Sequence, residues 1–189
     1  MAKPIAFLDA NVLYPAPVRD LLLNLADVGS YHPKWSAEVQ EEWLSSLLLM
    51  RNDLDEARLC QSQLAMDIAF PDAMVLDFHG IIDSLHLPDK DDRHVLAAAI
   101  AGKASFIVTE NLKDFPIKTL AAHGIRPITS DQFFSQVFAN SFDDVVYAFN
   151  AQVAKLRRPP KTTQEVLTSL RRCNLPVTVD LIEKANNRF

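Results

Sequence analysis

The fold class is decided by residues 95–111, VLAAAIAGKASFIVTEN. The apolar run Val95–Ala101 is predicted to be helical, and Gly102 stands where a left-handed residue would end that helix. Phe106–Val108 is then predicted to be a short buried strand, which polar residues follow at once. A helix that leads through a short connection into a buried strand predicts one unit of an α/β fold.

The same alternation extends from this stretch in both directions. Further short strands are predicted at Ile5–Leu8, Met74–Leu76 and Ile125–Ile128, the last after a second glycine helix end at Gly124. Helices are predicted at Val18–Val28, from an N-cap at Ser36 to Met50, at Leu54–Ile68, and from Asp91 or Asp92 onward. Because parallel strands need helical crossovers, this order predicts an α/β fold with a central, mainly parallel sheet.

Strand signals stop after about residue 139. The remaining residues carry helical patterns at Val145–Leu156, Gln164–Arg172 and Val179–Ala185, separated by proline-containing turns. We therefore predict two parts, an α/β domain at residues 1–139 and a helical C-terminal extension at residues 140–189.

Composition is that of an ordinary globular protein. The chain has 189 residues, of which 49% are hydrophobic and 23% charged. Its longest apolar run is far shorter than the roughly 20 residues that cross a bilayer, so no membrane segment is expected. Two distant cysteines without CxxC spacing favour a reducing compartment, and we expect a soluble cytoplasmic protein.

Charge is distributed unevenly along the chain. The net charge is −5, but residues 151–189 carry eight Lys and Arg against three Asp and Glu, and the preceding residues are strongly acidic. An acidic body is a poor nucleic-acid binder through bulk charge. The basic helices could hold a polyanion or an acidic protein, or they could be a solvated helix surface, and the sequence leaves both open.

Carboxylates follow the predicted strands at the edge where open α/β sheets bind ligands. Asp9 comes directly after the first strand, and Thr109 and Asn111 come after Phe106–Val108. Asp114 lies one turn further on, and Asp92 begins a helix. Each acid alone could be a helix cap. Their shared placement at one sheet edge favours a functional cluster.

The helix that starts after Ser36 offers one more carboxylate. With Val39 and Trp43 facing the core, Glu42 lies at the border of the buried face, and it is the acid that we choose. Glu38 would take its place if the helix register differed by one turn. Both candidates stay open at this point.

Gathered carboxylates need a counter-charge. Two unit negative charges about 4 Å apart repel by about 4 kcal/mol at an effective dielectric constant near 20. A divalent cation with oxygen ligands offsets this repulsion, and Mg²⁺ or Mn²⁺ suits such hard ligands. A metal held there can lower the pKa of a bound water and stabilise charge on a phosphoryl oxygen.

At these residues the sequence resembles the PIN-domain family, specifically the VapC-like ribonuclease toxins. The matching motifs are FLDANVL at 7–13, WS at 35–36 followed by Glu42, PDKDDRHVLAAA at 88–99 and IVTENLKDF at 107–115. The resemblance covers about residues 5–138. It implies a three-layer α/β sandwich, cleavage of single-stranded RNA assisted by Mg²⁺ or Mn²⁺, and the role of toxin in a toxin–antitoxin pair.

The resemblance also implies roles for individual residues and for partners. It assigns metal ligation to Asp9, Glu42 and Asp92, and it matches Asp114 to a more variable fourth acid. Supporting polar groups would be Asn11, Thr109 and Asn111. Members of this family usually form homodimers and are blocked by a protein antitoxin, so both partners are expected by analogy, beside the RNA substrate.

Other functions fit less well. A haloacid-dehalogenase phosphatase needs a second Asp where the chain has Asn11, and no early glycine motif is present for nucleotide phosphates. The histidines show no zinc-ligand spacing, and His94 is predicted to be an ordinary helix residue packed near the sheet. The serious alternative is a non-catalytic PIN-fold scaffold that binds RNA or protein.

Overall fold

A four-stranded parallel sheet lies at the centre of the computed structural model, which describes residues 3–186. The strands are β1 (Ile5–Leu8), β2 (His32–Lys34), β3 (Phe106–Val108) and β4 (Arg126–Ile128), in the spatial order β2-β1-β3-β4. Phe7 of β1 pairs with Ile107 of β3. The predicted α/β fold with a central parallel sheet is confirmed, and β1 and β3 have the predicted bounds.

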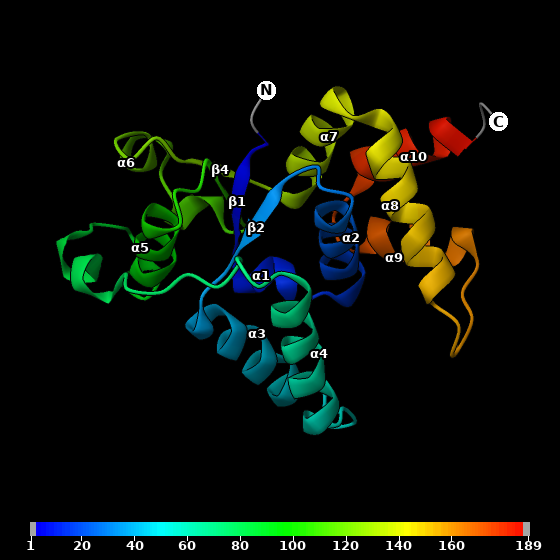
Figure 1. Ribbon diagram of the computed structural model, residues 1–189, viewed down its shortest axis with the longest axis horizontal. Helices are drawn as coiled ribbons and strands as arrows, with labels where there is room; N and C mark the ends of the chain where they lie inside the picture. The colour runs from blue at the N-terminus through cyan, green and yellow to red at the C-terminus, as the bar shows by residue number, and fades with distance from the viewer. Residues whose placement is uncertain (1–2, 187–189) are drawn as a thin grey trace.

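The chain before β4 supplies the helices around the sheet. They are α1 (Ala10–Leu13), α2 (Ala16–Asp27), α3 (Ala37–Met50), α4 (Glu56–Ala69), α5 (Arg93–Ala101), α6 (Ile117–Ala121) and the 3-10 helices η1 (His79–Ser84) and η2 (Leu112–Asp114). Figure 1 shows α5 on one side of the sheet and α2 on the other, while α3 and α4 project together away from it. Helices on both faces of a sheet make the layered architecture that the sequence predicts.

The second half adds α7 (Ser130–Asn140), α8 (Phe142–Lys155), α9 (Thr163–Arg172) and α10 (Pro176–Asn186). α8 packs along α2, and α10 packs along α7 (Figure 1). Phe149 of α8 and Ile182 of α10 are fully buried. The predicted C-terminal helices are therefore present and share one core with the layer beside the sheet, while the division at residues 139 and 140 stays a prediction.

The observed sheet differs from the predicted one at two strands. The strand β2 is absent from the sequence prediction because His32-Pro33-Lys34 is polar and contains proline. Proline is tolerated there because β2 is an edge strand. Met74–Leu76 is not a strand: Met74 forms only an isolated bridge with Trp35, and Leu76 is exposed.

The turn after α5 also differs from its prediction. Gly102 has a right-handed φ of −74°, and the left-handed conformation falls on Lys103, with φ of 54°. Gly102 is needed for a different reason, since a Cβ atom there would lie 2.9 Å from Cγ2 of Val75. Gly124 does take the predicted left-handed conformation, with φ of 71°.

No helix among residues 3–186 combines the length and the apolar character that crossing a lipid bilayer requires.

Candidate metal centre

The candidate site is a cavity of about 430 Å³ beyond the carboxyl end of β1. Asp9, Asn11, Glu42 and Asp92 line it, and Tyr14 contributes to its wall. These side chains come from the end of β1, from α1, from α3 and from the start of α5. The structure therefore brings together three of the four predicted acids with one predicted polar neighbour.

Asp9 is the most buried acid of the site, with 5% of its surface exposed. Its Oδ1 accepts a hydrogen bond from the backbone N–H of Ala10 at 2.7 Å. Its Oδ2 accepts from Asn11 Nδ2 at 2.6 Å and from Thr109 Oγ1 at 2.7 Å. Burial raises the pKa of Asp9, although the hydrogen bonds from Thr109 and Ala10 oppose the rise. The carboxylate is thus held in one orientation.

The predicted supporting groups form a continuous hydrogen-bond network. Asn11 Nδ2 also donates to Thr109 Oγ1 at 2.9 Å, and the backbone N–H of Asn111 donates to the same oxygen at 3.1 Å. The side-chain amide of Asn111 donates to Asp114 Oδ2. Asn11 and Thr109 therefore orient Asp9, and Asn111 orients Asp114.

The backbone N–H of Glu110 donates to Asn11 Oδ1 at 3.0 Å, but the Glu110 side chain serves another part of the molecule. Its Oε1 accepts hydrogen bonds from the backbone N–H of Ser130 at 3.1 Å and from Ser130 Oγ at 2.6 Å. Ser130 begins α7. Glu110 therefore joins the loop after β3 to the first turn of α7.

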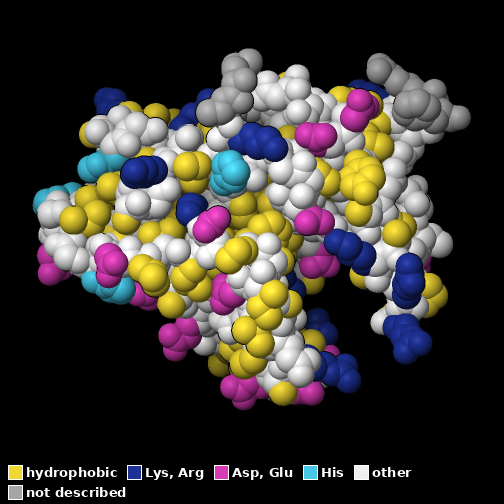
Figure 2. Space-filling model, viewed as in Figure 1, with side chains coloured by type: hydrophobic (Ala, Val, Ile, Leu, Met, Phe, Trp, Pro, Cys, Tyr) yellow, Lys and Arg dark blue, Asp and Glu magenta, His cyan; other side chains and the backbone are white. Residues whose placement is uncertain are grey.

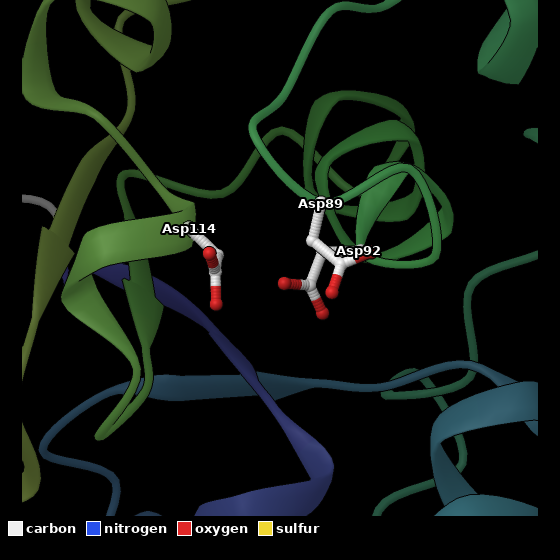
Figure 3. A group of neighbouring side chains, drawn as sticks. All are labelled: Asp89, Asp92 and Asp114. Carbon is white, nitrogen blue, oxygen red and sulfur yellow. The ribbon is translucent and has the colours of Figure 1, made fainter.

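A second group of carboxylates adjoins the cavity. Oxygen atoms of Asp89, Asp92 and Asp114 lie within 4.8 Å of one another. In Figure 3, Asp114 projects from one side and Asp89 and Asp92 from the other, into a common space. The fourth predicted acid thus joins the cluster through Asp92, which belongs to both groups.

Asp89 is the acid that sequence reasoning misses. It lies in the irregular segment before α5, where no periodicity tells which way a side chain points. Its Oδ1 also accepts the backbone N–H of Asp91 at 2.9 Å, which shapes the loop. The only sequence signal is the density of acids in Pro88–Asp92.

Asp92 is a second acid of the site whose pKa is raised. Burial raises its pKa to about 6, and the nearby carboxylates of Asp9, Asp89 and Asp114 add to the rise. Asp92 stands at the N-cap of α5 but makes no side-chain capping bond. Its Oδ2 is buried and accepts no hydrogen bond from any residue that the structure describes. A helix-cap role is therefore excluded, and a hard divalent cation is the group that this oxygen and its neighbours fit.

The structure also separates the two candidate glutamates of α3. Glu42 lines the cavity, and its Oε1 lies 2.9 Å from His94 Nε2. Glu38 instead pairs with His79 and does not line the cavity. His94 lies in a helix beside the sheet, as predicted, and it also contacts Glu42 of α3. Burial opposes protonation of His94, but the hydrogen bond to Glu42 raises its pKa on balance.

Two protein families match the chain. A PIN domain family matches residues 6–113, more than half of the chain, and the VapC50 C-terminal domain matches residues 130–184. This chain belongs to the PIN-domain family. The PIN match contains Asp9, Glu42, Asp89 and Asp92, and the C-terminal match covers most of α7 to α10.

One curated relative supports this membership over a shorter stretch. It is "Putative ribonuclease VapC50" of Mycobacterium tuberculosis, 50% identical over 61 residues. The matched stretch spans 32% of this chain and 36% of the relative. No solved structure matches the chain.

A second cavity, of about 460 Å³, is lined by residues of the PIN match and of the C-terminal helices. It lies between α2, α4 and α8, and Figure 2 shows the molecule hollowed beside the projecting α3 and α4. Apolar side chains such as Met66 and Phe70 share its wall with Asp20 and Lys155. None of the predicted site residues lines it.

Proposed function

We propose that this PIN-domain protein is a metal-dependent endoribonuclease that hydrolyses phosphodiester bonds of single-stranded RNA. The observation that carries the proposal is the buried Oδ2 of Asp92, which lacks a hydrogen-bond donor within the described chain. The carboxylates of Asp9, Asp89 and Asp114 raise the pKa of Asp92, and Glu42 shares its cavity. A fold keeps such an arrangement when a cation completes it. Magnesium or manganese is the proposed cation, because every candidate ligand is a carboxylate oxygen.

The residues divide into ligands and supports. Asp9, Glu42 and Asp92 would hold the cation in the cavity, and Asp114 with Asp89 would extend the site through Asp92. A bound divalent cation supplies Lewis acidity, which favours loss of a proton from the attacking water and stabilises charge on the phosphate.

The chain's own groups prepare the substrate position. Asn11 and Thr109 both donate to Oδ2 of Asp9, so that the direction of this carboxylate does not depend on the substrate. Tyr14 lies in the cavity wall and offers a ring on which an unpaired base can stack. Stacking of that kind favours single-stranded RNA, because its bases are unpaired and free to stack on a protein side chain.

We further propose that the protein is the cytoplasmic toxin of a toxin–antitoxin pair, active as a homodimer and inhibited by a protein antitoxin. Two findings support this proposal: the match to the VapC50 C-terminal domain and the name of the relative. The basic C-terminal helices are a suitable contact for an acidic partner or for RNA.

The test uses the full chain and labelled single-stranded and double-stranded RNAs of the same sequence. We expect cleavage of the single strand with Mn²⁺ or Mg²⁺, loss of cleavage with EDTA, and loss in Asp9→Asn, whose shape is unchanged. Asp143→Asn removes the same charge from an exposed position on α8 and should cut at the wild-type rate.

Two results would overturn the proposal. If Asp9→Asn cut RNA as fast as the wild type, the site assignment would be wrong. If the wild-type chain bound RNA but cut no single-stranded sequence with either metal, the non-catalytic scaffold would be the correct function.

A further inference from the structure

Two glutamate–histidine pairs lie one turn apart along α3. Glu42 pairs with His94 and Glu38 pairs with His79. The histidines differ in their surroundings, because the His94 side chain is 15% exposed and the His79 side chain is 67% exposed. Only the first pair borders the acidic cavity, since Glu42 lines it and Glu38 does not. The second pair is therefore a natural reference for the first.

Glu42 needs an external contact to stay at the cavity. Its side chain is 46% exposed, and its charge contributes to the raised pKa of Asp9, so the two carboxylates repel each other. A long side chain with several rotamers would relieve this repulsion by turning toward solvent. His94 Nε2, which lies 2.9 Å from Glu42 Oε1, is the contact that restrains this side chain.

The position of His94 links two acids from separate elements. It is the second residue of α5, which begins directly after Asp92. The same helix start therefore carries Asp92 into the cavity and places the imidazole against Glu42 of α3. Asp92 and Glu42 are thereby held in a fixed relation, although 49 residues of the chain lie between them.

The contact requires only a neutral imidazole. His94 Nε2 lies 2.9 Å from Glu42 Oε1, within reach of an N–H in the Nε2–H tautomer, and Nδ1 is buried without a hydrogen-bond partner among residues 3–186. One hydrogen bond and the surrounding packing fix the ring. No change of charge on His94 is part of this role.

We propose that His94 is a positioning residue that holds Glu42 ready to ligate the divalent cation, an inference that rests on the proposed metal-dependent function. His94 acts on the cation through Glu42 and does not line the cavity itself. Loss of a hydrogen-bond partner that orients a metal ligand typically lowers metal affinity or activity roughly 10- to 100-fold. The maximal rate should therefore recover once the cation is in excess.

The experiment compares three variants of the full chain with the wild type. His94→Leu removes the donor, His94→Gln keeps an N–H donor at a similar reach, and His79→Leu removes the reference pair. The dissociation constant for Mn²⁺ is measured from the electron paramagnetic resonance signal of free Mn²⁺. RNA cleavage is then measured from low to saturating Mn²⁺.

We expect His94→Leu to weaken Mn²⁺ binding roughly 10- to 100-fold and to regain near wild-type cleavage at saturating Mn²⁺. His94→Gln should bind Mn²⁺ within a few-fold of the wild type, as should His79→Leu. If the leucine variant fails to fold, His94→Asn replaces it, because asparagine is too short to reach Glu42 and should also weaken binding.

The outcomes separate this inference from the function on which it rests. Unchanged Mn²⁺ affinity in His94→Leu or His94→Asn, with normal wild-type binding, would overturn the role of His94 alone. Activity that stays low at saturating Mn²⁺ would also overturn it, since a residue acting only through metal affinity is rescued by metal. Absence of Mn²⁺ binding by the wild type would overturn the proposed function itself.

Discussion

Asp92→Asn is expected to stabilise the protein in EDTA at neutral pH. The pKa of Asp92 is raised from 3.8 to about 6, so the folded state binds this proton more tightly than the unfolded chain does. Stability from this group is therefore full below about pH 4 and is lost as pH rises through about 6. Asparagine does not titrate, and it avoids that loss.

The magnitude follows from the same shift. Each pKa unit corresponds to about 1.36 kcal/mol in the free energy of unfolding. Because the Asp92 side chain is partly open to solvent, we discount the contribution of its shift to about 1 kcal/mol. For a chain of this size, about 1 kcal/mol corresponds to roughly 2–4 °C in melting temperature. The variant and the wild type should melt together near pH 4 and diverge by that amount above about pH 6.5.

Thermal melting in EDTA across this pH range measures the effect, and a second series contains Mn²⁺. A cation at 100 times its dissociation constant stabilises the wild type by about 2.7 kcal/mol. In Mn²⁺ the wild type should therefore have a higher melting temperature than Asp92→Asn. A variant that is less stable than the wild type in EDTA at pH 7.5, or a difference that does not change with pH, would refute the reasoning.

Three further outcomes are expected. Glu42→Gln should lower RNA cleavage about 100-fold or more while Glu38→Gln leaves it near the wild-type rate, and equal loss in both would contradict the choice of glutamate. Asp131→Ala should lower the free energy of unfolding by about 1–2 kcal/mol in urea titrations, because its carboxylate accepts three hydrogen bonds at the start of α10. Phe149→Ala should lower the free energy of unfolding by about 3–5 kcal/mol in one transition. Tyr147 is 66% exposed, so Tyr147→Ala should change the free energy of unfolding little. A separate early transition would show that the C-terminal helices unfold on their own.

Regular elements with strong patterns were the predictable part of the fold. The apolar runs Ile5–Leu8 and Phe106–Val108 have no alternative to a buried strand, and Ser36 caps α3 as its position predicts. β2 could not be predicted, because its pairing with β1 and not its composition makes it a strand. The helical pattern of α8 predicts a helix but not its packing partner, α2.

The site was predictable where an acid follows an element with a known direction. Asp9 and Glu42 are of this kind, since a strand end and a helix face fix where they point. Asp89 lies in an irregular loop and His94 contacts a different helix, so both depend on tertiary arrangement. The spacing of residues in the sequence does not show which separate elements come into contact.

The two outer strands carry a feature with a consequence for assembly. The backbone N–H groups of His32 and Arg126 point inward and are bonded to neighbouring segments, so the next residues, Pro33 and Pro127, face outward. Proline has no N–H to offer, and each margin of the sheet therefore lacks a donor for an incoming strand. Intermolecular strand addition is disfavoured on both sides, and a second copy of the chain would have to associate through helical surfaces.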